Sequence, residues 1–336
     1  MNKRSDTGGF VRAGDLPLLQ QELIRLPAAE DVAVFDPIES EVIRPEDLAY
    51  THSVFVQCFL PLRHNLRNND EWETGNRNAK LVITAGRLIN PAKPGEFRKC
   101  AVPAGPKARL LAAYINDYAF RNRTPTVNLG DSMRTFMDSV LHGDPPEPGE
   151  KKHNRIGGKN GREIKRELEN FAAAEIILGV WSADGSAHQE QTKVARRMSF
   201  WIDKNPDQRS LWQPEMTLSD EYYRTLIDGD HIAPIHWRAN LKLQDNPRAM
   251  DILNFLTYRL RKPIRKPVLL HAKVLHAMFG RDVKHLRHFW PRFQQALEQA
   301  RRHYPGARVE VLNDALALYD SPALIPYRKT SYLDRL

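Results

Sequence analysis

The sequence predicts an α+β protein made of two winged-helix domains, the first of which carries an added small β-sheet. Three observations predict this fold. A proline opens the first helix of each half, at Pro106 and Pro247, and the strand residues Leu129 and Leu270 follow at the same offset. Each half then continues with a second helix and a basic third helix. Each half closes with a β-hairpin, which completes the element order of a helix-turn-helix with a wing.

Length and charge set the general class of protein. The chain has 336 residues, enough for two ordinary domains, and a formal net charge of +9, which favours an anionic partner. Its two cysteines, Cys58 and Cys100, make neither a disulfide framework nor a zinc site. No apolar run approaches the roughly 20 residues that span a bilayer, and the N-terminus lacks the apolar core of a signal peptide. We therefore expect a cytoplasmic protein without a membrane partner.

Composition shifts along the chain suggest four parts. We expect a flexible N-terminal arm at 1–48, a first winged-helix domain at 49–205, a second at 206–322 and a C-terminal tail at 323–336. The arm is predicted from its prolines and scattered acids. The apolar runs HSVFVQCFLPL and AKLVITAGRL are typical of strands, and we expect them to form the added sheet.

The first half contains clear helix and strand signals. A helix that begins near Pro106 should end before Pro125, and VNL should form a short strand. Asp131 is a suitable N-cap for the second helix. A basic, glycine-rich loop should lead to a third helix that begins at about Arg162. The hairpin EIILGVWSADGS…VARRMSFWI should follow, with its turn near Asp184-Gly185.

The third helix of each half has one apolar stripe and one basic face. In the first half the stripe that should turn inward is Ile164, Leu168, Phe171 and Ala172. In the second half it is Leu286, Phe289, Phe293 and Leu297. Pro291 either kinks this second helix or begins a new one. The closing hairpin of the chain should turn at Asn313-Asp314.

The outward basic faces predict double-stranded DNA as the partner, because the major groove admits one α-helix. We expect one groove to receive Arg162, Lys165 and Arg166, and another to receive Lys284, Arg287 and Arg292. We expect His288, on the same basic helix, to touch phosphate or solvent. We expect contacts to the DNA backbone from Lys159, Arg196, Arg197, Arg265 and Lys266. The sequence does not separate the residues that read bases from those that bind phosphate.

Motifs for catalysis are weak. His285 and His288 have helical spacing, but no cysteine or compact acid cluster completes a metal site. Tyr222 and Tyr223 could suggest a DNA-nicking nucleophile, yet the paired histidines that such chemistry needs are missing. The run GDPPEPGEK lacks the spacing and the closing Lys-Ser/Thr pair of a phosphate loop. We therefore expect a protein that is not an enzyme and that uses no metal or other cofactor.

Several blocks, in order, resemble one family. They are HSVFVQCFLPLR, VPAGPKARLLAAYINDYAFRNRTPTVNLGDSMRTFM, KPVLLHAKVLHAMFG and LNDALALYDSPALIP, and they span about residues 50–326. In these blocks the chain is similar to the plasmid-encoded RepA replication initiators. The resemblance implies binding to repeated sequences (iterons) at a plasmid origin, opening of the duplex, recruitment of the host initiator and helicase, and repression of its own promoter. It implies no catalytic residue.

Two other functions stay open. A sequence-specific transcriptional regulator without a replication role would share every feature above. A DNA-nicking or other nucleic-acid enzyme is the further alternative. The sheet expected around residues 52–90 could also serve to form a homodimer.

Overall fold

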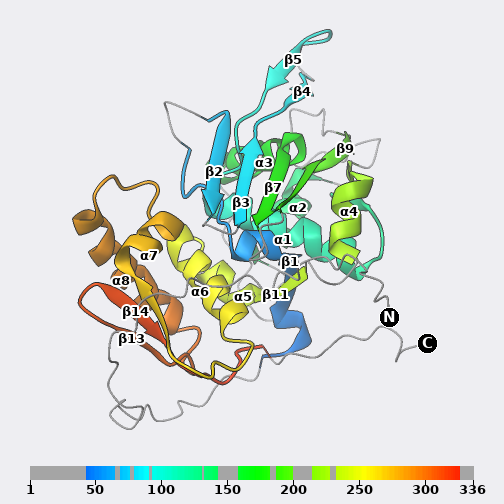
Figure 1. Ribbon diagram of the computed structural model, residues 1–336. Helices are drawn as coiled ribbons and strands as arrows, with labels where there is room; N and C mark the ends of the chain where they lie inside the picture. Colours follow the sequence, from blue (N-terminus) through cyan, green and yellow to red (C-terminus); the bar gives the residue numbers. More distant parts are fainter. Residues whose placement is uncertain are drawn as a thin grey trace, which may run out of the picture.

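The computed structural model describes residues 43–64, 69–75, 79–90, 93–130, 132–142, 158–181, 187–199, 214–227 and 232–325. In these ranges the protein is a mixed α/β structure with eight α-helices and several small antiparallel sheets (Figure 1). The expected arm and tail therefore lie mostly outside the described residues. No helix in the described ranges is long and apolar enough to cross a membrane.

The described residues form eight α-helices and two short 3-10 helices among the strands. The helices are α1 (Gly105–Arg121), α2 (Met133–His142), α3 (Gly158–Ala173), α4 (Asp220–Ile227), α5 (Trp237–Lys242), α6 (Pro247–Arg259), α7 (Ala272–Phe279) and α8 (Leu286–Arg301). The 3-10 helices are η2 (Pro45–Asp47) and η3 (Ser53–Val56).

Five small sheets contain the strands of the described residues. A four-stranded sheet has the order β2 (Glu71–Gly75), β3 (Ala79–Thr84), β7 (Glu175–Trp181), β8 (Ala187–Lys193). Two three-stranded sheets have the orders β6 (Thr126–Asn128), β10 (Glu215–Leu218), β9 (Ala195–Met198) and β12 (Val268–His271), β14 (Ala315–Leu318), β13 (Val309–Val311). The pairs are β1 (Leu48–His52) with β11 (Ile232–His236), and β4 (Arg87–Ile89) with β5 (Phe97–Lys99).

The internal repeat is visible in the topology. The first half contains α1, β6, α2 and α3 in this order. The second half contains α6, β12, α7 and α8, which is the same order of helices and strands. The two three-stranded sheets also have the same strand order. In each, the last strand in the sequence (β10 or β14) lies in the centre, between the strand that follows the first helix (β6 or β12) and the remaining strand (β9 or β13). Because β10 pairs with β6 and β9, this first sheet combines strands from both sides of the boundary expected at residue 205.

The apolar run after His52 is not a strand, which corrects the sequence-based expectation. The chain forms η3 there, and the His52 ring accepts a hydrogen bond from the Val54 amide. Cys58, Phe59 and Leu60 are buried one after another, so this part of the run does not alternate between two faces as a strand of a half-exposed sheet would. The charged segment before AKLVITAGRL supplies strand β2 instead.

The third helix of the first half begins earlier than expected, at Gly158 instead of Arg162. Part of the predicted glycine-rich loop is therefore helical. A Cβ at Gly161 would lie 3.0 Å from the Met137 sulfur, so this glycine lets α3 pack closely against α2.

The hairpin after α3 differs from the expected one, because β7 pairs with β8 (AHQEQTK) and not with the predicted strand VARRMSFWI. β7 pairs with β8 across a turn that lies outside the described residues, and β7 also pairs with β3. The hairpin thus extends the added sheet, and β9 pairs with β10. In α8 the helix continues through Pro291, which leaves the Arg287 carbonyl without its usual helical donor.

The predicted apolar stripes are confirmed in both third helices. Ile164, Leu168, Phe171 and Ala172 of α3 are buried, as are Phe289, Phe293 and Leu297 of α8, while Leu286 is half-buried. The second helix of the first half has its cap one residue after the expected position, because Ser132 Oγ accepts the Thr135 amide. Asp131 lies outside the described residues.

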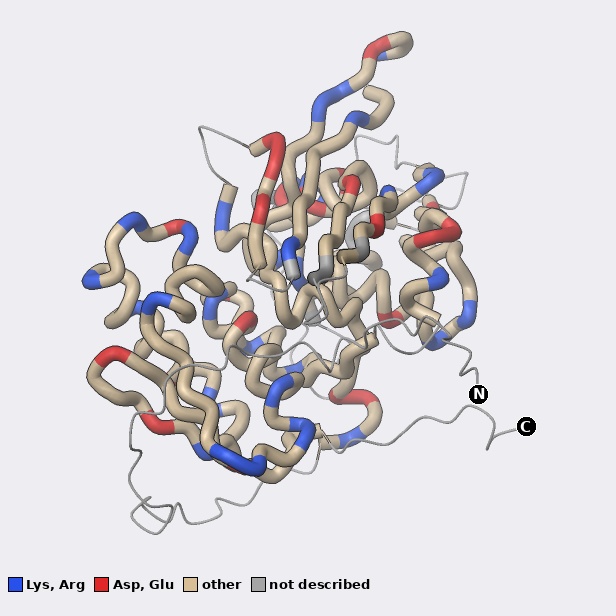
Figure 2. Tube along the Cα trace, viewed as in Figure 1, with Lys and Arg blue, Asp and Glu red and all other residues tan. Residues whose placement is uncertain are grey.

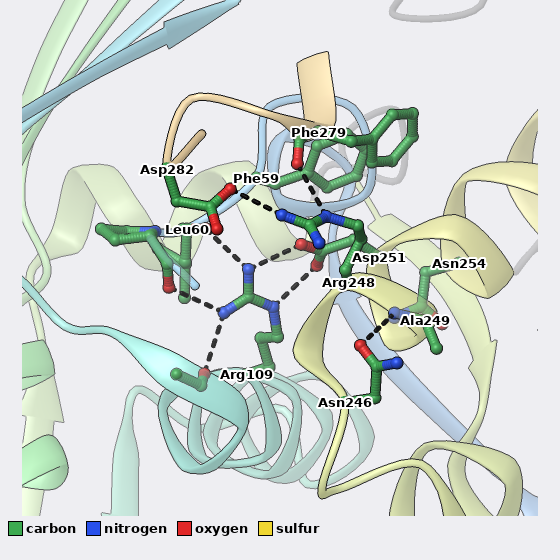
Figure 3. A network of polar contacts seen from close by, with 12 residues as sticks. Phe59, Leu60, Arg109, Asn246, Arg248, Ala249, Asp251, Asn254, Phe279 and Asp282 are labelled. Carbon is green, nitrogen blue, oxygen red and sulfur yellow. Dashed lines mark hydrogen bonds and ion pairs between the residues drawn. The ribbon is translucent and has the colours of Figure 1, made fainter. Parts of the chain in front are cut away.

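A buried ion pair joins the two halves (Figure 3). Arg109 of α1 donates to both carboxylate oxygens of Asp251 on α6, over 2.7 and 2.6 Å. The same guanidinium donates to the carbonyls of Leu60, Pro61 and Gly105. Burial raises the pKa of Asp251, and the Arg109 guanidinium opposes that rise.

Further contacts extend this junction toward the turn between α7 and α8. Arg248 donates to the Phe279 carbonyl and forms an ion pair with Asp282 at 2.6 Å. The Phe279 ring stacks on Phe59, with 4.6 Å between ring centroids. Arg281 donates to the Glu73 carbonyl of β2. The α7–α8 turn is therefore fixed to the first half of the chain.

We predict that Asp251→Ala lowers the free energy of unfolding by about 3–5 kcal/mol, because Arg109 would be left buried without its charge partner. Urea unfolding followed by circular dichroism measures this loss. Glu73→Ala is the matched control, since its ion pair with Lys80 is exposed and should contribute about 0–1 kcal/mol. Equal, small losses for both variants would show that the buried pair does not stabilise the junction.

Candidate nucleic-acid interface

The outer face of α3 carries the cations that the sequence selects. Arg162 and Arg166 are exposed and Lys165 is half-buried. In the described part of the chain no carboxylate forms an ion pair with Arg162 or Lys165, whereas Arg166 Nε lies 3.0 Å from a Glu167 oxygen. Arg162 and Lys165 are thus the cations of this face most available to an anionic partner. Lys159 lies in the first turn of α3, but its side chain is outside the described part.

The opposite side of α3 holds buried polar residues that fix the helix. The Glu167 carboxylate accepts from His64 at 2.7 Å and from the Ala104 amide at 3.0 Å. Asn170 accepts the Ala101 amide. These contacts hold α3 against the segment that follows β5. Sequence reasoning missed them because charged residues in a basic helix are usually solvent-exposed.

The hydrogen bonds that Glu167 accepts lower the pKa of its carboxyl group. Burial alone would raise the pKa of this carboxyl, but the His64 ring, the Ala104 amide and Arg166 together lower it below the ordinary value. Glu167 therefore stabilises the folded state when it is ionised.

The exposed face of α8 forms the second basic surface. Lys284, Arg287, His288 and Arg292 are all exposed on or just before its first two turns. Within the described ranges none of these side chains pairs with a carboxylate, and Arg287 Nε donates to the His288 ring at 3.3 Å. Gln295 and Glu298 follow these cations on the exposed side of the helix, and the next basic residues, Arg301 and Arg302, lie at its other end. We call the side chains of Lys284, Arg287, His288 and Arg292 the α8 patch.

Arg196 and Arg197 are exposed on β9, at the edge of the first three-stranded sheet. Both have acidic neighbours that the sequence does not reveal. Arg196 forms an ion pair with Asp220 at 3.2 Å, and Arg197 lies 4.0 Å from Glu215. Such exposed pairs are weak, so a phosphate could replace the carboxylate.

Arg265 and Lys266 are also exposed, in the loop that leads into β12. The Ile264 amide binds Asp320, which follows β14, so this loop lies at one end of the sheet. The β13–β14 turn lies at the other end, where the Ala272 amide donates to the Asp314 carbonyl. The two residues therefore form a separate basic loop. In Figure 2, basic positions accordingly occur in more than one region of the surface.

Of the two tyrosines considered as nucleophiles, Tyr222 is buried and Tyr223 is half-buried. The Tyr222 hydroxyl donates to Asn116 at 3.0 Å, and burial raises its pKa. The rings of His285 and His288 lie 6.0 Å apart. Among the described residues no group of three or more His, Cys, Asp or Glu side chains could hold a metal ion.

Taken together, these features define a class: mixed α/β proteins with two repeated units, each of which exposes a basic third helix. Residues 102–266 match the family described as "Plasmid encoded RepA protein". The resemblance to plasmid-encoded RepA proteins is thereby confirmed. The match begins just before α1, runs through the first unit and ends after α6.

Other comparisons add little. A crystal structure of domain 2 and domain 3 of RctB is similar, with a TM-score of 0.47 and 11% sequence identity over 84% of this chain and 100% of that chain. At this score the likeness carries no argument about function. No curated protein matches the chain.

We predict that Glu167→Gln lowers the free energy of unfolding by about 1–3 kcal/mol at neutral pH, because buried donors lose a charged acceptor. Since the folded-state pKa is lowered, the carboxylate stabilises the fold above its unfolded pKa, and this contribution is lost as pH falls through the folded value. The difference between variant and wild type should therefore shrink below about pH 4. Urea unfolding at several pH values tests this, with exposed Glu190→Gln as the control. A difference independent of pH would contradict the assignment.

Proposed function

We propose that this protein is a plasmid replication initiator that binds repeated double-stranded DNA sequences at an origin. The observation that carries the proposal is the repeat itself. Two units of the same topology each present a basic third helix whose opposite face is buried. The match to plasmid-encoded RepA proteins supports the replication role.

Each repeated unit is interpreted as a winged helix. In the second unit α7 and α8 would be the helix-turn-helix, and the β13–β14 hairpin would be the wing. In the first unit α2 and α3 would take the same roles, with β9 and β10 as the strands of the wing. On this interpretation the domain limits follow the repeats, with the added sheet β2-β3-β7-β8 attached to the first unit.

The third helices would enter the major groove in successive DNA segments. Arg162 and Lys165 would contact one segment and the α8 patch another, where an arginine can bind guanine O6 and N7. Arg196 and Arg197 would bind the phosphate backbone beside α3. Arg265 and Lys266 would need bent DNA, or a second duplex, to take part, because they lie at the other end of their sheet.

Recruitment of the host initiator and helicase, and repression of its own promoter, complete the proposed role, which needs no catalysis by this chain. A regulator without a replication role would bind DNA in the same way. A plasmid that carries the gene and its flanking repeats separates the two, because only an initiator maintains it in a host that cannot otherwise replicate it.

We predict stepwise binding to a duplex taken from beside the gene and containing its direct repeats. Binding to this duplex should exceed binding to a scrambled duplex by about a thousandfold or more. Affinity for both should fall steeply with salt, because phosphate contacts release counterions. Gel-shift titrations at several salt concentrations measure both effects. Equal affinity for the two duplexes would contradict sequence-specific binding and would show that the basic helices bind DNA of any sequence.

We predict that Arg287→Ala weakens binding to the repeat duplex by about 5- to 100-fold, because one charged contact in the groove is lost. Arg302→Ala is the matched control: Arg302 is also exposed, but it follows the C-terminus of α8, about 20 Å along the helix. Fluorescence anisotropy gives both affinities. Equal effects of the two substitutions would mean that α8 does not enter the groove by its N-terminal half.

A further inference from the structure

The β4–β5 hairpin projects away from the rest of the molecule (Figure 1). Its two strands pair in the register Arg87 with Lys99 and Ile89 with Phe97, so these four side chains share one face. That face is turned to solvent. Phe97 is 68% exposed and Ile89 is 54% exposed, the highest values among the large apolar side chains of the described residues.

The hairpin is firmly attached to α3 at its base. Arg98, on the other face, forms an ion pair with buried Glu169 of α3 at 2.6 Å. Gly86 precedes β4, and a Cβ there would lie only 2.1 Å from the Ala173 carbonyl oxygen at the end of α3. The exposed face is therefore held at a fixed position beside the helix proposed to enter the groove.

The chemistry of this face suits unpaired bases better than a duplex. Phe97 and Ile89 have no hydrogen-bond donor or acceptor in their side chains, so they cannot hydrogen-bond to base edges in a groove. An exposed aromatic ring can stack on a base whose own face is uncovered, as in a single strand. Arg87 and Lys99 lie one row away, about 7 Å along the strands, within reach of phosphates of the same nucleic-acid strand.

The charges argue against a second copy of this chain as the occupant. A two-fold contact would bring the face against itself and gather the positive charges of Arg87 and Lys99 from both copies in one interface. In Figure 2 basic positions recur along the hairpin. Lys99 Nζ lies 2.5 Å from Asp70, but both side chains are more than half exposed, so a phosphate can replace this weak pair.

We infer that the β4–β5 hairpin binds single-stranded DNA, with Phe97 stacked on a base and Arg87 and Lys99 on the phosphates. This inference rests on the proposed function: α3 holds the duplex, and the hairpin takes a strand released beside it.

The test measures how the full chain binds two fluorescently labelled DNA probes, from the change in probe anisotropy. The probes are a single-stranded thymine homopolymer of about 20 nucleotides and the repeat duplex. Phe97→Ala should weaken single-strand binding by about 5- to 100-fold, the range expected for one stacked base. Its affinity for the duplex should stay within about twofold, since Phe97 makes no groove contact on this proposal. Phe97→Trp should retain binding, because it keeps an aromatic face. Val311→Ala is the control: it truncates another exposed apolar side chain, on β13, and should leave single-strand binding unchanged.

The outcomes separate the inference from the proposed function. If the wild type binds the duplex specifically but not the homopolymer, or if Phe97→Ala binds the homopolymer as the wild type does, the inference is wrong and the proposed function stands. Binding to neither probe overturns both. A wild-type dimer that Phe97→Ala converts to a monomer in sedimentation would assign the face to a second copy and overturn the inference. Phe97 is exposed, so an unchanged thermal unfolding midpoint is expected and excludes a folding defect.

Discussion

The buried ion pair between Arg109 and Asp251 is the constraint on which the arrangement of the two repeated units depends. It joins α1 to α6, the first helices of the two units, through two parallel hydrogen bonds. Such a bidentate pair fixes direction as well as distance, and neither charge tolerates burial without the other. Since α3 packs on α1 and α8 packs on α6, the two basic helices are held in one relative orientation.

The sequence predicted those parts of the fold in which local signals and burial agree. Pro106 and Pro247 lie in the first turns of α1 and α6, and the apolar stripes of α3 and α8 face inward as their spacing requires. The sequence-based prediction was wrong where contacts between distant parts of the chain decide which residues are buried and which strands pair. The run after His52 is apolar because it fills the core from every side, and β7 joins β3, a partner distant in sequence that no local pattern reveals.

The candidate site was predictable as a set of charges, but not as a set of contacts. Arg196 has its acidic neighbour Asp220 from a distant part of the chain, whereas Arg287 has none among the described residues. The exposure of Phe97 was not predictable either. An aromatic residue in a strand pattern indicates burial, and only the outward projection of its hairpin leaves the ring in water. In each case the missing information is which segments lie near one another in space.

The pairing of β1 with β11 has a consequence for how the chain is made. During translation, Leu48 emerges long before His236, its partner in the sheet. Among the described strands β1 pairs with β11 alone, so a nascent chain holds an unpaired strand until the ribosome has passed the whole first unit. Contacts of such wide sequence separation form late and slowly. A chain that stops before β11 is therefore left with an open strand edge prone to aggregation.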